Sequence, residues 1–366
     1  MSLDFHKSFL QLIKLGIGTS KDAKISKDID WKSLKALADE QGLSAVILDA
    51  LNTDGTNLTD GMSLELKLGW IGEVLQAYEG RCLQYKKAIG SLARFYNQHG
   101  FKMMVLKGYS CSLNWPKPEH RPCGDIDIWL FGKQKEADEA LEEWLNSSKV
   151  QEFKVDKSHH HHTVFNWQGF SVENHYDFVN VHHHKSSAEM ESIFKKLGKD
   201  DSIYVKVDGE KVYLPSANLH ALFLLRHAMV HFAATELILR QLLDWAFFVK
   251  AHGKEVDWLW LEGILEEYGM KRLYDVFNAI CVGDLGFDVN IFPKVQFEPE
   301  VKEKVINEIL NPAIPNDIPK TLIPRVFWKY RRWKANEWKH KLVYRESIWS
   351  AFLSGVWSHL LKPASI

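Results

Sequence analysis

Two short stretches decide the fold of this 366-residue chain: LKGYS at residues 106–110 and RPCGDIDIWL at residues 121–130. The first predicts a buried strand that ends in a glycine turn, and the second predicts a strand of apolar residues interrupted by Asp127. Asp125 and Asp127 are two residues apart, so on a strand both carboxylates point to one face. Adjacent carboxylates repel each other and need a cation, and their hard oxygen atoms suit Mg²⁺.

The glycine turn that precedes the acids predicts a phosphate-binding site. Free backbone N–H groups at such a turn can cradle phosphates, with Lys107 and Ser110 as further donors around Gly108. A phosphate-binding turn beside a carboxylate pair is typical of metal-assisted phosphoryl or nucleotidyl transfer. An isolated Asp-x-Asp is more often structural, so the prediction depends on the turn and the acids together.

The sequence around both stretches predicts an α+β domain over residues 99–215, with a short mixed β-sheet and helices. One β-hairpin is expected over residues 163–176. A second is expected over residues 203–214, because Asp208-Gly209 is a favoured two-residue turn.

Helical regions are expected on both sides of this domain. Apolar residues at helical spacing predict an N-terminal helical region over residues 1–98, including one long helix from Leu64 toward Tyr96. A C-terminal helical region is expected over residues 216–366.

The composition excludes several classes of protein. Hydrophobic residues make up 46% and charged residues 25%, which excludes a largely disordered chain. The net charge is −1, so no overall basic field would collect nucleic acid. The four cysteines form no CxxC pair, which argues against a disulfide framework or a cysteine zinc site and favours a cytoplasmic location. No apolar run is long enough to predict a transmembrane segment.

Together, VLKGYS (105–110) and RPCGDIDIWL (121–130) resemble the nucleotidyltransferase superfamily of the DNA polymerase β type. More narrowly, they resemble a family of uncharacterised bacterial nucleotidyltransferases whose members often accompany surface-polysaccharide gene sets. The chain departs from the superfamily at the glycine turn, where Gly108-Tyr109 stands in place of the usual Gly-Ser pair, and the spacer to Asp125 is slightly long. This departure favours the alternative of a catalytically silent relative that binds a nucleotide or a partner.

The resemblance implies an enzyme in which an acceptor hydroxyl attacks the α-phosphorus of a nucleoside triphosphate and pyrophosphate leaves. Asp125 and Asp127 would hold Mg²⁺ or Mn²⁺. The superfamily normally needs a third carboxylate on a neighbouring strand, and Glu173 matches that position, with Asp177 as the alternative. Glu173 would share the metal ion and accept the proton of the hydroxyl. The sequence does not choose among sugar, antibiotic, protein and RNA acceptors.

The resemblance also implies residues that bind the nucleotide. Gly108 and Ser110 would contact its phosphates, while Lys107 and Arg121 would neutralise their charge. His175 is expected on the same face of its strand as Glu173. Its position in the motif matches a histidine of the resembled family, which assigns it to the predicted site.

Three residues of the C-terminal helical region belong to the predicted site as well. In the resembled family a histidine and an Arg–Asp pair recur in this region, and His227, Arg240 and Asp244 match them. They would cover the nucleotide or the acceptor. The alternative is a buried ion pair in a helical core.

Two histidine runs, at residues 159–162 and 182–184, have no place in the superfamily's chemistry. Alternating histidines on a strand could bind zinc or copper, and His160 or His162 could line the cleft. Solvated histidines are the alternative.

The segment of residues 325–345 is both basic and aromatic. It could bind nucleic acid, or it could contact a membrane peripherally together with an interfacial helix over residues 349–361. The alternative is an amphipathic helix that packs its aromatic side chains on the domain.

Overall fold

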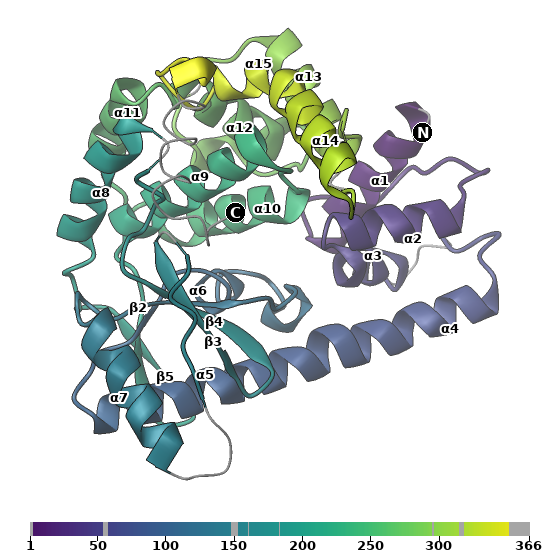
Figure 1. Cartoon of the computed structure of the whole chain (residues 1–366). Coiled ribbons are helices and arrows are strands. Elements are labelled where there is room, and N and C mark those ends of the chain that lie inside the picture. The colour runs from purple at the N-terminus through teal and green to yellow at the C-terminus, as the bar shows by residue number, and fades with distance from the viewer. Residues whose placement is uncertain are drawn as a thin grey trace. The chain divides into compact units, whose positions relative to one another are not determined.

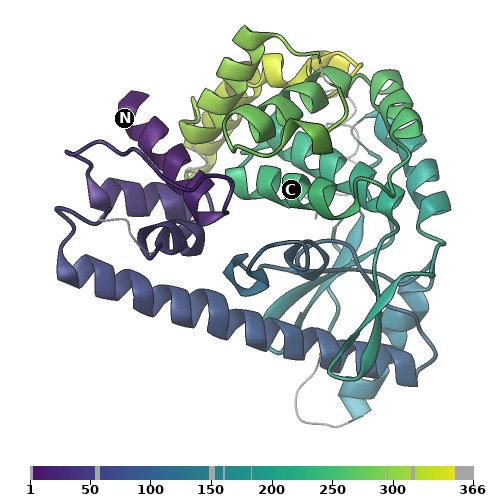
Figure 2. The ribbon, with the colours of Figure 1, turned by 180° about the vertical axis from the view of Figure 1, so that it is seen from behind.

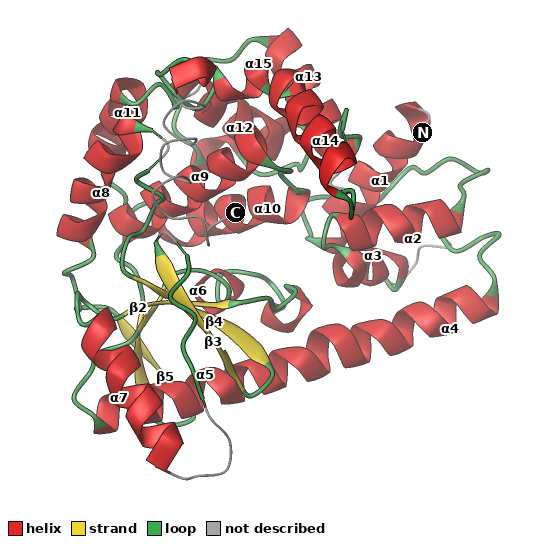
Figure 3. Ribbon diagram, viewed as in Figure 1, coloured by secondary structure: helices red, strands yellow, loops and turns green. Residues whose placement is uncertain are grey.

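The computed structural model describes residues 3–53, 58–147, 153–159, 161–182, 184–294, 296–314 and 318–350 of the chain. Helices dominate, and the strands gather in a mixed sheet (Figures 1 and 3). The predicted α+β class with a short mixed sheet is therefore confirmed.

The contacts within the chain divide it into two compact units, each built from three segments. The first unit comprises Met1–Arg81, Asn114–Pro122 and Leu224–Val343, and the second comprises Cys82–Leu113, Cys123–Phe223 and Tyr344–Ile366. The three regions expected from the sequence, divided after residues 98 and 215, stay a prediction.

Six strands of the second unit form one sheet in the described residues, in the order β3-β4-β2-β1-β6-β5. The strands are β1 (Met104–Val105), β2 (Ile126–Trp129), β3 (His162–Trp167), β4 (Phe170–His175), β5 (Tyr204–Val207) and β6 (Glu210–Tyr213). β2 runs parallel to β4 and antiparallel to β1, and β1 runs parallel to β6. The antiparallel pairs β3–β4 and β5–β6 confirm both predicted hairpins. Asp208 and Gly209 have φ angles of 49° and 86°, as a type I′ turn requires.

The central strand β2 separates an apolar face of the sheet from a polar one. Ile126 and Ile128 pack with Val172 of β4 in an apolar cluster that includes side chains of α5 (Arg81–Gln98) and α7 (Gln134–Ser147). α5 runs alongside the sheet in both views (Figures 1 and 2). Because side chains alternate along a strand, Asp127 points to the opposite face together with Glu173, its partner in the β2–β4 register.

Helices and the loops between them make up the rest of the described chain. The long helix expected from Leu64 is confirmed, because α4 continues through a π-helical segment, η1, directly into α5. None of the helices in the described ranges combines the length and apolar character needed to cross a membrane. The remaining helices are α1 (Leu3–Gly16), α2 (Trp31–Glu40), α3 (Ser44–Leu51), α4 (Leu64–Glu73), η1 (Val74–Gly80), α6 (Tyr109–Ser112), η2 (Pro118–His120), α8 (Lys185–Leu197), α9 (Ala217–Ala234), α10 (Leu239–His252), α11 (Trp258–Glu267), α12 (Lys271–Gly283), η3 (Val289–Ile291), α13 (Pro299–Leu310), α14 (Leu322–Ala335) and α15 (Glu337–His340).

α14 corrects one expectation for the basic aromatic segment. Trp338, just after α14, does pack inward, with its ring 5.5 Å from that of Phe232. Phe327 and Tyr330 of α14 are instead exposed. The Arg332 side chain of this helix is buried, and the charges of Glu236 and Glu308 act on it. Residues 351–361 of the expected interfacial helix lie outside the described residues.

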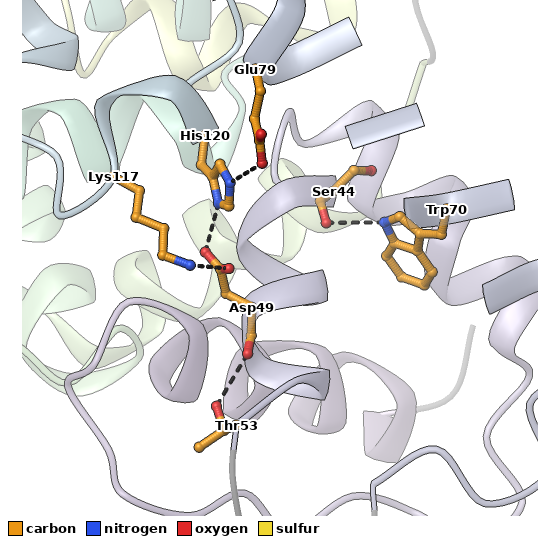
Figure 4. A network of polar contacts seen from close by, with 7 residues as sticks. All are labelled: Ser44, Asp49, Thr53, Trp70, Glu79, Lys117 and His120. Atoms are coloured by element: carbon orange, nitrogen blue, oxygen red, sulfur yellow. Dashed lines mark hydrogen bonds and ion pairs between the residues drawn. The ribbon is translucent and has the colours of Figure 1, made fainter. Parts of the chain in front are cut away.

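The segment Asn114–Pro122, which connects the β1 region to β2, belongs to the first unit. Its His120 ring lies between two carboxylates, with Nδ1 2.7 Å from Asp49 Oδ2 and Nε2 3.2 Å from Glu79 Oε1 (Figure 4). Lys117 Nζ lies 2.5 Å from the other oxygen of Asp49. Burial opposes the charge of His120, but its contacts with the carboxylates outweigh burial and raise its pKa. The network ties the connecting segment to α3 and η1.

Arg121, the next residue, forms a buried bidentate pair with Asp244 of α10. Its Nε and Nη2 donate to Asp244 Oδ1 and Oδ2 at 2.7 and 2.9 Å, and Trp115 Nε1 donates to Oδ1 at 2.8 Å. Arg240 lies against Gly42 and reaches the carbonyl of Pro122 at 3.5 Å. The structure therefore pairs Asp244 with Arg121, whereas the sequence suggested Arg240.

We expect Asp244→Asn to lower the free energy of unfolding by about 3–5 kcal/mol, because it leaves the Arg121 guanidinium buried beside a neutral side chain. The double variant Arg121→Met/Asp244→Leu should recover part of this loss, since no charge remains buried. The recovery is incomplete because Trp115 loses its acceptor. Chemical denaturation of the unchanged protein, Asp244→Asn and the double variant measures the effect.

Glu298→Gln provides the matched control in the same unit. Glu298 accepts a bidentate pair of hydrogen bonds from Arg272, both at 2.7 Å, but this pair is exposed. Its loss should change stability little. Equal losses for Asp244→Asn and Glu298→Gln would contradict a structural role for the buried pair.

Candidate active site

Four of the predicted site residues meet on the polar face of the sheet in the second unit. Asp127 lies on β2, Glu173 and His175 lie on β4, and Lys107 follows β1. His175 Nε2 is 3.2 Å from Asp127 Oδ1 and 3.5 Å from Glu173 Oε2. Lys107 Nζ is 2.9 Å from the same Asp127 oxygen. The parallel register of β2 and β4 places the two carboxylates side by side, and two cations lie against them.

The charges of this cluster determine its protonation. Burial alone would raise the pKa values of Asp127 and Glu173, but the contacts with Lys107 and His175 outweigh it, lowering the pKa of Asp127 and holding that of Glu173 well below its usual range. Burial would likewise lower the pKa of His175, but its hydrogen bonds to both carboxylates raise it to about 9. At neutral pH the cluster therefore holds two carboxylates, one ammonium and one imidazolium, whose charges balance.

Asp125 and Asp127 have different surroundings. Asp125 lies just ahead of β2 with an exposed side chain, while Asp127 is buried. The charge of Asp125 is among those that raise the pKa of Lys107, so its carboxylate lies near the amine. Its backbone carbonyl accepts a hydrogen bond of 2.8 Å from the hydroxyl of Tyr85, a residue that belongs to none of the sequence motifs.

The predicted phosphate turn is a tight junction at the start of α6. Gly108 adopts a φ of 69°, and any Cβ there would collide with the hydroxyl of Tyr85. Tyr109 begins α6, whose first backbone N–H groups have no partner within the helix. Ser110, which was expected to contact phosphates, is buried in this helix.

Two histidines of the first run join the cluster, His162 at the start of β3 and His161 just before it. His162 is the register partner of His175, and their rings lie 5.3 Å apart. One ligand atom each of His161, His162 and His175 lies within 4.8 Å of the others, and the same holds for Asp127, Glu173 and His175. Imidazole nitrogens suit Zn²⁺, whereas carboxylate oxygens suit Mg²⁺ and Mn²⁺. Burial lowers the pKa of His162 to about 4. His160 lies outside the described residues.

A protein-family model described as "Uncharacterised nucleotidyltransferase" matches residues 27–282, more than half of the chain. The chain belongs to this family. The resemblance drawn from the glycine turn and the acids is thereby confirmed, and membership supports a general role in nucleotidyl transfer with a nucleoside triphosphate as substrate. No curated protein and no solved structure matches the chain.

The other predicted site residues belong to the first unit. Arg121 and Asp244 form the buried pair described above, and Arg240 contacts Pro122. The ring of His227 lies 4.4 Å from that of His231, one helical turn along α9. Roles for these four residues at the nucleotide stay predictions.

We expect Gly108→Ala to destabilise the nucleotidyltransferase by about 1–3 kcal/mol more than Gly100→Ala. Both glycines have positive φ angles, 69° and 78°, so both substitutions strain the backbone. A Cβ at Gly100 meets no atom within 4 Å, whereas one at Gly108 meets the Tyr85 hydroxyl. Thermal and chemical denaturation compare the two variants.

The same comparison in a Tyr85→Phe background isolates the collision. Removing the hydroxyl should shrink the difference between the alanine variants. The tight junction would be contradicted if Gly108→Ala and Gly100→Ala lowered stability equally in the unchanged protein. It would also be contradicted if the difference between them persisted in Tyr85→Phe.

The pH dependence of stability should report the protonated state of His175. Its pKa is raised in the folded protein, so its stabilisation is fully present below about pH 6.5 and is lost as the pH rises through 9. In EDTA, the free energy of unfolding should fall by up to about 3 kcal/mol over this interval. His175→Gln should remove the fall, while His99→Gln in the same unit should retain it. A profile that is unchanged by His175→Gln would contradict the ion pairs.

Proposed function

We propose that this nucleotidyltransferase moves a nucleoside monophosphate from a nucleoside triphosphate to a hydroxyl of an acceptor. The acceptor oxygen forms a bond to the α-phosphorus, the bond from that phosphorus to the bridging oxygen breaks, and pyrophosphate leaves with the electron pair. The proton of the hydroxyl passes to Glu173. The main support is the pairing of Asp127 with Glu173 across two parallel strands, beside the glycine turn.

The donor set fits a hard divalent cation, because Asp127 and Glu173 supply neighbouring carboxylate oxygens and Asp125 adds an exposed carboxylate nearby. These three residues would hold Mg²⁺ or Mn²⁺. When bound, such an ion supplies positive charge that stabilises the transferring phosphoryl group and the leaving pyrophosphate.

Donor groups of the protein itself would bind the triphosphate. An ammonium has three N–H donors, so Lys107 can keep its contact with Asp127 and still donate to a phosphate. The glycine turn would add backbone N–H groups at the start of α6. His175 would hold Glu173 and Asp127 in place by its hydrogen bonds to both. The low pKa of Glu173 keeps it ionised at neutral pH, as a ligand of a divalent cation must be.

A catalytically silent relative that binds a nucleotide is the second candidate. The altered glycine turn and the burial of Ser110 favour it, because a buried hydroxyl cannot reach a phosphate without rearrangement. Binding of ATP with Mg²⁺ but without release of pyrophosphate would support this candidate over the enzyme.

The test is release of pyrophosphate from each of the four nucleoside triphosphates with Mg²⁺ or Mn²⁺, in the presence of sugar, aminoglycoside, protein and RNA acceptors. Asp125→Asn should lower the rate at least about 100-fold with unchanged stability, because this side chain is exposed. Asp127→Asn should abolish activity as well, but it also removes the charge that Lys107 and His175 contact.

Two aspartates of the same unit provide matched controls. Asp200 is exposed, and Asp138 is buried on hydrogen bonds from Thr163 and Asn174. Asp200→Asn and Asp138→Asn should leave the rate nearly unchanged. An Asp125→Asn variant as active as Asp200→Asn would overturn the assignment of the acids.

A further inference from the structure

α14 presents an apolar stripe to solvent. Ile323, Phe327 and Tyr330 are 82%, 62% and 55% exposed. Their spacing of four and three residues places them on one side of the helix, one above the other. Isolated exposed apolar residues are common, but a continuous stripe along a helix marks an interaction surface.

α14 differs from an ordinary surface helix in the placement of Arg332 and of the apolar stripe. Such a helix turns its apolar stripe to the core and its charges to water. α14 instead buries the guanidinium of Arg332, which lies 4.8 Å from the ring of Trp328, and exposes the stripe. Packing within the first unit therefore does not account for the three apolar residues.

Cations accompany this stripe. The sequence of α14, LIPRVFWKYRRWKA, contains no acidic residue, and Arg325, Lys329, Arg331 and Lys334 are exposed. The guanidinium of Arg331 lies 6.0 Å from the ring of Phe327, and Lys334 follows Tyr330 by one helical turn. Apolar and basic side chains thus share one surface.

We propose that α14 is a membrane-docking helix that lies in the interface of a bilayer rich in anionic phospholipid. The apolar stripe would enter the boundary between headgroups and acyl chains, and the basic side chains would contact the lipid phosphates. At 14 residues, α14 is about 21 Å long, which suits a helix that lies along the surface. This role is independent of the proposed nucleotidyl transfer.

The stripe also distinguishes a membrane from the other partners that a basic surface could take. Nucleic acid would use the cations, but an aliphatic side chain as exposed as Ile323 gains nothing from a phosphate backbone. A second copy of the chain would bring its own cations against these cations, and like charges repel.

The test is co-sedimentation of the full-length protein with vesicles of phosphatidylcholine alone or mixed with phosphatidylglycerol. We expect binding to the mixed vesicles, weakened but not abolished by salt, and little binding to phosphatidylcholine. Ile323→Ser/Phe327→Ser should weaken binding at least about tenfold at every salt concentration. Lys329→Gln/Arg331→Gln should weaken it about 20-fold at low salt and less at high salt.

Leu259→Ser is the matched control, because Leu259 on α11 of the same unit is 87% exposed but lies among acidic residues. It should bind vesicles like the unchanged protein. Circular dichroism checks that each variant is folded.

Three results would overturn the proposal. One is equal or absent binding to both kinds of vesicle. The second is binding of RNA or DNA in place of vesicles, unaffected by Ile323→Ser/Phe327→Ser. The third is self-association, seen by analytical ultracentrifugation, that the same double substitution abolishes while vesicle binding is absent.

Discussion

The second unit depends on one electrostatic constraint, the neutralisation of the buried Asp127 carboxylate. A carboxylate inside a sheet is costly unless cations and hydrogen bonds compensate it. Lys107 and His175 provide the positive charge and the hydrogen bonds. Lys107 comes from the end of β1 on one side of β2, and His175 comes from β4 on the other side. The order of strands β4-β2-β1 therefore brings together three chain segments that are distant in sequence.

The same constraint gives the cluster its chemical character. Two carboxylates that stay ionised at neutral pH are ready ligands for a cation, and the protein itself supplies the balancing charges in the described residues. Removal of either Lys107 or His175 would leave buried negative charge without full compensation. Stability and function are thus coupled at this site, which is why exposed Asp125 is more informative about chemistry than buried Asp127.

Local sequence predicted what depends on neighbours along the chain. The alternation around Asp127, the Asp208-Gly209 turn and the long helix from Leu64 follow from short-range patterns, and all are present. The meeting of Asp127 with Glu173 required the family resemblance, because nothing local sets the register of parallel strands. Contacts between distant residues were not predictable. They include the Tyr85 hydroxyl below Gly108, the inward turn of Arg332, and the choice of Arg121 as the partner of Asp244.

The slightly long spacer between the glycine turn and Asp125 has a structural explanation. Between them the chain leaves the second unit, and Asn114–Pro122 is held in the first by His120 and Arg121. A direct connection between β1 and β2 would not need these residues, since antiparallel neighbours can be joined by a short loop. The first-unit segment Asn114–Pro122 ends three residues before Asp125 and five before Asp127. The acids therefore follow directly, along the chain, on a segment that two polar networks hold in the first unit, and the extra residues of the spacer are those that form these networks.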